Sequence, residues 1–248
     1  MRAYSRHADC AWLAVIIIAA AAFRIFAWNC QIIPTRDSLF YTWMIENYDA
    51  FGESSVVRKA ASVPPLFIVM LHTAAKIAGS AEIGGVLMNF IAGLLLVPCV
   101  YGIGRAVFKD RGGALLCAFL IAVNPILAKL SITVQREPLY LTFCAMSLYL
   151  ALREHRNDSR FYRDSFFCGV AAAAAASIRY EGMEMMIYLP PVLYFLRAGS
   201  CRLCAPAFRG VLFCLAGGVV FALLLFLLCG VTAGATMKMF MAKLSSII

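Results

Sequence analysis

Long uninterrupted runs of apolar residues are the feature that most constrains this chain. The longest cover residues 11–28, 83–103 and 210–232, each close to the length that crosses the hydrocarbon core of a bilayer as a helix. Of the 248 residues, 63% are hydrophobic and 14% are charged, and the mean hydropathy is +0.84. A soluble domain of this size cannot bury so much apolar surface, and disordered chains are far more polar. The sequence therefore predicts an integral membrane protein.

Shorter apolar stretches lie between the second and third long runs. Each crosses a bilayer only if it extends into its flanks or if the protein thins the membrane locally. Because backbone polar groups need partners inside the hydrocarbon, a helical bundle is the only reasonable architecture. We expect an all-α polytopic bundle of about seven spans, with residues 1–248 forming a single membrane domain. The shorter stretches are residues 114–127, 138–152, 165–178 and 183–196.

The first apolar run contains one charged residue, Arg24, near its far end. A cleavable signal peptide is the alternative interpretation of this run, but the run is longer than the usual apolar segment of a signal. We therefore expect a first transmembrane helix. Its Arg24 side chain is expected to extend to the interface, where the charge stays hydrated.

The distribution of positive charge predicts an orientation. The chain has 22 Lys and Arg against 13 Asp and Glu, a net charge of +9. These basic residues form short clusters between apolar runs rather than a basic stripe interleaved with aromatics, so nucleic acid is not an expected partner. If residues 65–78 lie along the outer face, most clusters share one side with the N-terminus, as the positive-inside rule favours.

This orientation defines the expected location. The N-terminus is expected in the cytoplasm and the C-terminus outside the plasma (inner) membrane. Residues 29–82 then form the first external loop, with interfacial helices. The external face also receives residues 129–137 and the turn at residues 179–181, which hold the charges that are least easily explained as topology signals.

The first external loop contains a carboxylate ahead of an aromatic-rich segment. Asp37 or Ser38 is placed to cap a helix that begins there, since short polar side chains favour that position. A carboxylate at the mouth of a membrane cavity can instead act as a general base or orient a hydroxyl group. The sequence leaves both roles open for Asp37.

Two further charged segments interrupt the apolar pattern. Arg136 and Glu137 come directly before the stretch that opens at Pro138, and Arg179 and Glu181 interrupt an apolar region of 33 residues, 165–197. Charged side chains at membrane depth are costly and usually line a pathway or a site. An arginine fork suits a phosphate group, but Arg179 also has the alternative of simply pairing with Glu181 or Glu137.

The order of these motifs resembles membrane glycosyltransferases of the GT-C superfamily, of the protein O-mannosyltransferase and aminoarabinose-transferase type. Shared features are a loop acid before an aromatic-rich helix, a Pro-Pro-Leu element, a Gly-Arg turn, an Asn-Pro followed by Arg-Glu, and an Arg-x-Glu-Gly turn. Ser38 stands where many relatives have a second acid, and relatives are commonly much longer, so a C-terminal half is expected to be missing. The matching segments are residues 36–41, 63–67, 89–93, 101–105, 124–125, 136–137 and 177–182.

This resemblance implies transfer of a sugar from a polyprenyl-phosphate-linked donor to an acceptor glycan, lipid or protein on the external face. It implies that Asp37 is catalytic and acts on the acceptor hydroxyl. It further implies that Arg179, with Arg136 as second candidate, stabilises the leaving lipid phosphate. Glu137 positions a substrate or holds an arginine in place. A divalent cation is compatible with this chemistry and not required by it. The implied substrate-binding residues are Arg36, Tyr41, Arg136, Glu137, Arg179 and Glu181.

Two other functions fit the sequence. A shortened, non-catalytic relative could bind lipid-linked sugar or partner proteins in the membrane. A small transporter is the third alternative, but transporters favour paired broken helices in corresponding halves. The breaks expected around Pro125 and at Pro190-Pro191 have contexts that do not match each other.

Overall fold

The structure, a computed structural model, describes residues 2–30, 34–47, 63–153, 158–198 and 205–229. The described residues form helices joined by short connections, with no strand among them, which confirms the all-α prediction. Much of the expected first external loop lies outside the described residues, as do the last residues of the apolar run at 210–232. The elements are α1 (Arg2–Cys30), α2 (Arg36–Glu46), α4 (Pro65–Ala78), α5 (Ala81–Phe108), α6 (Arg111–Ala122), α7 (Pro125–Ser131), α8 (Glu137–Leu152), α9 (Asp158–Ile178), the short 3-10 helix η1 (Tyr180–Gly182), α10 (Met183–Ala198) and α11 (Ala205–Cys229).

Local sequence explains where several of these helices begin and end. The α2 helix is capped by Thr35, whose hydroxyl accepts a hydrogen bond from the backbone N–H of Ser38. The expectation that Asp37 or Ser38 caps this helix is therefore wrong, because both lie inside its first turn. The α4 helix ends at Gly79, which adopts φ = 73°, a left-handed conformation that glycine adopts without strain.

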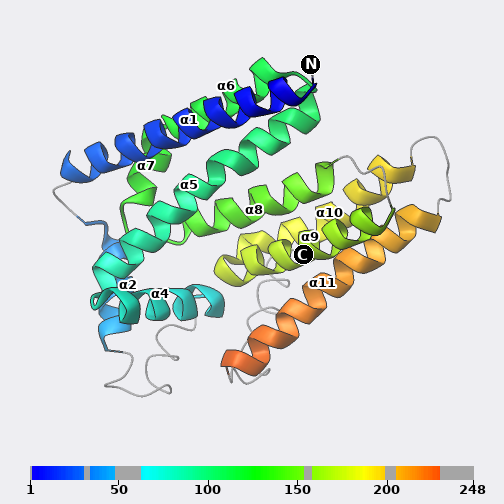
Figure 1. Ribbon diagram of the computed structural model, residues 1–248. Coiled ribbons are helices and arrows are strands. Elements are labelled where there is room, and N and C mark those ends of the chain that lie inside the picture. Colours follow the sequence, from blue (N-terminus) through cyan, green and yellow to red (C-terminus); the bar gives the residue numbers. More distant parts are fainter. Residues whose placement is uncertain (1, 31–33, 48–62, 154–157, 199–204, 230–248) are drawn as a thin grey trace.

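The long helices run side by side in alternating directions between two ends of the bundle (Figure 1). One end holds the start of α1 and the tight turn between α5 and α6, where Arg111 pairs with Asp9. The other end holds α2, α4, the connection between α7 and α8, and η1; we call it the α2 end. Because the helices alternate in direction, segments far apart in sequence meet at the α2 end.

Not every helix is long and apolar enough to cross a membrane. In the described part of the chain, Asp9–Cys30, Ala81–Phe108 and Ala205–Leu227 meet that criterion. The α6 and α7 helices meet it together, with a bend of 56° at their break, so the number of spans by length and composition is three or four. The expected count of about seven is not confirmed, because α8 is short and α9 opens with charged residues.

Arg24 lies inside the bundle, and the expectation that it extends to the interface is wrong. Its side chain is 0% exposed and donates hydrogen bonds to the Ala122 carbonyl at 3.1 Å, the Ser131 hydroxyl at 3.3 Å and the Gly93 carbonyl at 3.4 Å. A helix end leaves carbonyls without helical partners, and the break before Pro125 creates such an end within the bundle. The Ala122 carbonyl at this break, together with the Ser131 hydroxyl at the end of α7, holds the guanidinium in the interior.

Small residues let α9 pack closely against its neighbours. The alanines at positions 171–175 are all buried. A Cβ atom added at Gly169 would lie 1.8 Å from the carbonyl oxygen of Cys214 on α11, and one at Gly217 would lie 2.1 Å from the carbonyl of Phe166. This packing agrees with the use of small residues where membrane helices approach one another, and it places the end of α9 firmly at the α2 end.

Candidate functional site

The α2 helix is fastened to the connection between α7 and α8 by a buried serine. The Ser38 hydroxyl accepts a hydrogen bond from the Val134 N–H at 2.8 Å and donates one to the Val134 carbonyl at 3.3 Å. Asp37, its neighbour, is exposed in the first turn of α2. The contact therefore buries one face of α2 and leaves the carboxylate of Asp37 on the open face.

The α7–α8 connection is in turn held by α5. Asn89 is 0% exposed, and its Nδ2 donates to the carbonyls of Thr133 at 2.6 Å and Gln135 at 2.8 Å. The Gln135 side chain donates to the Thr35 hydroxyl at 3.0 Å, which completes the link back to the start of α2. These bonds fix the backbone immediately before Arg136.

Arg136 lies over an aromatic ring with part of its guanidinium unpaired. Its guanidinium carbon is 5.7 Å from the centre of the Tyr41 ring, a cation–π distance. The Nε atom of Arg136 is buried and has no hydrogen-bond partner among the described residues. A buried, unpaired cationic donor is costly unless another group accepts from it. Arg136 and Tyr41 are thus brought together as a cationic surface with capacity for an anion.

Arg179, by contrast, is engaged by two carboxylates. Its Nη1 atom lies 2.7 Å from Glu137, at the start of α8, and its Nε atom lies 3.1 Å from Glu181 in η1. Burial lowers the pKa of Arg179, but the negative charge of Glu137 and the hydrogen bond and charge of Glu181 outweigh it, so the pKa is raised. The Arg179 guanidinium also lies 5.9 Å from the centre of the Tyr140 ring. The prediction that Arg179 pairs with Glu137 or Glu181 is confirmed for both.

The Tyr41 hydroxyl is buried near several of these charged groups. Burial raises its pKa, the charges of Asp37 and Glu137 raise it further, and those of Arg136 and Arg179 lower it. Charges influence a pKa appreciably only over short distances. The contacts of Arg136 with Tyr41 and of Arg179 with Glu137 bring α2, the start of α8 and the turn after α9 together at the α2 end.

The predicted residues differ in how directly they meet. Tyr41 contacts Arg136, and Glu137, Arg179 and Glu181 form one ion-pair cluster. Asp37 lies on the same helix as Tyr41 without a direct bond to either group among the described residues, and both Asp37 and Arg36 are exposed in the first turn of α2.

Sequence reasoning missed the residues that position the site. The sequence offers Ser38 as a helix cap or in the place of a second acid, and Asn89 as part of a motif of the family resemblance, and predicts a positioning role for neither residue. One available signal was that Asn89 is a strongly polar residue within an apolar run, where such residues need a partner. The identity of that partner, the α7–α8 connection, was not accessible without the fold.

The acids near this site are not arranged as a metal centre. Among the described residues, no three His, Cys, Asp or Glu side chains are grouped so that they could hold a metal ion. Glu137 and Glu181 are both bonded to Arg179, which leaves Asp37 as the one of the three predicted site acids with an open face. We assign no step to a metal.

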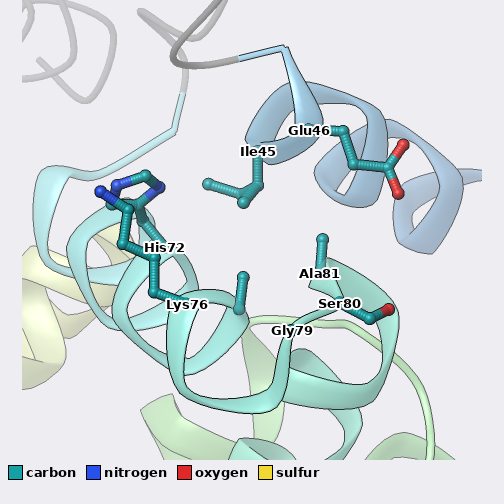
Figure 2. A pocket seen from close by; sticks show the side chains of 8 residues that line it. Ile45, Glu46, His72, Lys76, Gly79, Ser80 and Ala81 are labelled. Carbon is teal, nitrogen blue, oxygen red and sulfur yellow. The ribbon is translucent and has the colours of Figure 1, made fainter.

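A separate cavity lies beside Ile45 and Glu46, the last two residues of the α2 helix. It has a volume of about 430 Å³ and is bordered by α2, α4 and the start of α5 (Figure 2). The lining contains none of the predicted site residues. This cavity is therefore distinct from the charged cluster around Tyr41.

The apolar helices are those of a membrane protein, and a family-model match makes this protein a membrane glycosyltransferase of GT-C type. Residues 62–229 match the family model described as dolichyl-phosphate-mannose-protein mannosyltransferase, so the chain belongs to that family. Neither the curated proteins nor the solved structures gave a match to the chain. The match covers Arg136, Glu137, Arg179 and Glu181, whereas Asp37 and Tyr41 precede it.

Proposed function

We propose that this protein transfers a hexosyl or pentosyl group from a polyprenyl-phosphate-linked donor to an acceptor on the external face of the plasma (inner) membrane. The observation that carries this proposal is the arrangement at the α2 end, where Arg136 lies over Tyr41 of α2, Glu137 pairs with Arg179, and Asp37 is exposed in the first turn of the same α2 helix. The family match supports a glycosyltransferase that uses a polyprenyl-phosphate donor. A site with both a carboxylate and guanidinium groups suits a reaction that removes a proton from one substrate and leaves negative charge on the other.

In the proposed step, an acceptor oxygen attacks the anomeric carbon of the donor sugar. The bond from that carbon to the phosphate oxygen breaks, and the polyprenyl phosphate leaves with the electron pair. The Asp37 carboxylate takes the acceptor proton as a general base. Attack from the face opposite the phosphate inverts the configuration at the anomeric carbon.

We assign the leaving phosphate to Arg136 first and to Arg179 second, the reverse of the order expected from sequence. The Arg136 Nε atom has no partner among the described side chains and backbone groups, whereas Arg179 already bonds to two carboxylates. Preorganised cations stabilise charge that develops on a leaving group. Glu137 and Glu181 then serve to hold Arg179, and Arg36 is left at the exposed rim as a contact for substrate.

A transfer assay on the full chain, inserted in a membrane with a labelled polyprenyl-phosphate sugar, tests this proposal. Asp37→Asn is expected to lower turnover by about 100-fold or more, the usual contribution of a general base. Arg136→Gln is expected to weaken donor use more than Arg179→Gln does. Glu82→Gln, an exposed acid in the first turn of α5, is the matched control and should keep full activity. Undiminished turnover in Asp37→Asn contradicts the mechanism.

A further inference from the structure

The cavity between α2, α4 and α5 carries charges of both signs on separate elements. His72 and Lys76 reach it from α4, one helical turn apart, and Glu46 borders it from the last turn of α2. In Figure 2 the Glu46 carboxylate lies on the α2 side, away from both basic side chains. Neither Glu46 nor Lys76 forms an ion pair within the part of the chain that the structure describes. The cavity thus offers a cationic wall and a separate anionic wall.

The floor between these walls is apolar. Ile45 and Ala81 are buried there, and Ala75 on α4 is nearly so, at 9% exposure. The Ser80 side chain also lines the cavity. A ligand that fits this lining has a negative group, a short hydrocarbon linker and a positive group.

The two helices that border the cavity, α2 and α4, also carry exposed apolar side chains. Leu39 and Trp43 on α2 are 58% and 43% exposed, and Val69 and Ile77 on α4 are 41% and 84% exposed. Exposed apolar and aromatic side chains on short helices are typical of the boundary between membrane and water. At that boundary the abundant phosphates belong to lipid headgroups.

We propose that this cavity binds the headgroup of a zwitterionic phospholipid that carries a primary amine, of the phosphoethanolamine type. Lys76 and His72 contact the phosphate, the two-carbon linker lies over Ile45 and Ala81, and Glu46 accepts hydrogen bonds from the ammonium group. A membrane lipid seated here fixes α2 against α4 and so steadies the helix that carries Asp37 and Tyr41. The inference goes beyond sugar transfer, because it concerns binding at a separate cavity and requires no turnover.

Native mass spectrometry of the purified full chain tests this inference. The protein is delipidated and then offered equal amounts of phosphatidylethanolamine, phosphatidylglycerol and diacylglycerol. We expect phosphatidylethanolamine to be retained best and diacylglycerol least. Lys76→Gln is expected to lower phospholipid retention about tenfold, as loss of one hydrogen bond to a charged group implies. Lys76→Arg keeps the charge and should retain the lipid.

Another variant tests the anionic wall, a control variant tests whether the effect is specific to the cavity, and a water-soluble ligand tests whether the source of the headgroup is a lipid. Glu46→Gln should remove the preference for phosphatidylethanolamine over phosphatidylglycerol while retaining both lipids. Lys129→Gln, an exposed lysine on α7 outside the cavity, is the matched control and should bind as the natural chain does. Wild-type retention by Lys76→Gln, an unchanged preference in Glu46→Gln, or equal retention of diacylglycerol overturns the inference. If water-soluble glycerophosphoethanolamine binds with the same affinity as phosphatidylethanolamine, the ligand of the cavity does not come from a membrane lipid, and the inference is overturned on that point. Because no sugar transfer is measured, these outcomes are independent of the transfer assay.

Discussion

At the scale of single residues, the two arginines of the site have different surroundings. Arg179 is held by two carboxylates, and Arg136 lies over Tyr41 with a buried Nε atom that lacks a partner among the described residues. The family resemblance implied Arg179 as the first candidate for the leaving phosphate and Arg136 as the second. The paired state of Arg179 suits a structural role, and the unpaired donor of Arg136 suits a ligand.

Tyr41 gives a prediction at this scale. Burial raises its pKa above the ordinary value of 10.0, so the folded protein holds the phenol proton more tightly than the unfolded chain does. This contribution to stability is fully present below pH 10 and is lost as the pH rises through the higher folded-state pKa. Tyr41→Phe removes the titrating group, so its thermal midpoint should fall less than that of the natural chain between pH 9.5 and 11.5.

The control for this measurement is Tyr188→Phe, because Tyr188 is 63% exposed on α10. That variant should follow the natural chain across the same alkaline range. If Tyr41→Phe loses stability as steeply as the natural chain does, burial of the phenol is not what couples this site to pH.

At the scale of elements, the break between α6 and α7 determines where the site lies. The 56° bend redirects the chain, so that the α7–α8 connection reaches Ser38 on α2 and Asn89 on α5. Arg24 supports this break from α1 by bonding to the Ala122 carbonyl and the Ser131 hydroxyl. A residue within the first helix thereby supports the backbone that leads to Arg136.

Replacement of Arg24 tests this dependence. Arg24→Leu leaves the buried Ala122 carbonyl, at the end of α6, without its donor, at a cost of about 1–3 kcal/mol for the unsatisfied group. We expect a clear fall in the thermal midpoint in detergent. Arg24→Lys should recover little of the loss, because one ammonium group cannot reproduce the planar fork of a guanidinium.

Arg209→Leu is the matched control for Arg24, since Arg209 is exposed on α11. Its thermal midpoint should stay close to that of the natural chain. Equal midpoints for Arg24→Leu and Arg209→Leu would show that the buried hydrogen bonds of Arg24 contribute nothing measurable to the fold.

At the scale of the whole molecule, the alternating helices place the charged site and the basic turn at Arg105–Arg111 at opposite ends of the bundle. We propose that these ends face opposite sides of the membrane, with about seven spans, residues 29–82 outside and the N-terminus in the cytoplasm. In this arrangement the shorter helices cross where the bilayer thins around the protein. The basic turn then obeys the positive-inside rule.

Cysteine labelling of intact cells tests this topology. In a chain without its native cysteines, Asn47→Cys at the α2 end should react with an impermeant reagent added outside. Asp110→Cys, in the turn between α5 and α6, should react only after the membrane is permeabilised. Labelling of both positions from the same side contradicts the proposed orientation and the placement of the site on the external face.

Much of the fold could be predicted from the residues in order. The apolar runs gave the helices, and the expected boundaries of the segment at 65–78 agree with those of α4 (Pro65–Ala78). Contacts across the bundle could not be obtained in this way. The position of Arg24 depends on carbonyls about 70 to 100 residues away, and the partners of Ser38 and Asn89 depend on how α7 turns.

The sequence by itself determined that this chain is a helical membrane protein of a glycosyltransferase family, because hydropathy and local motifs are properties of neighbouring residues. Only the tertiary structure decided which charges meet. It placed Arg136 over Tyr41, paired Arg179 with two acids, and left the Arg136 Nε atom without a partner among the described residues. The physical reason is that electrostatic interactions depend on distance in space, and the packing of helices sets that distance.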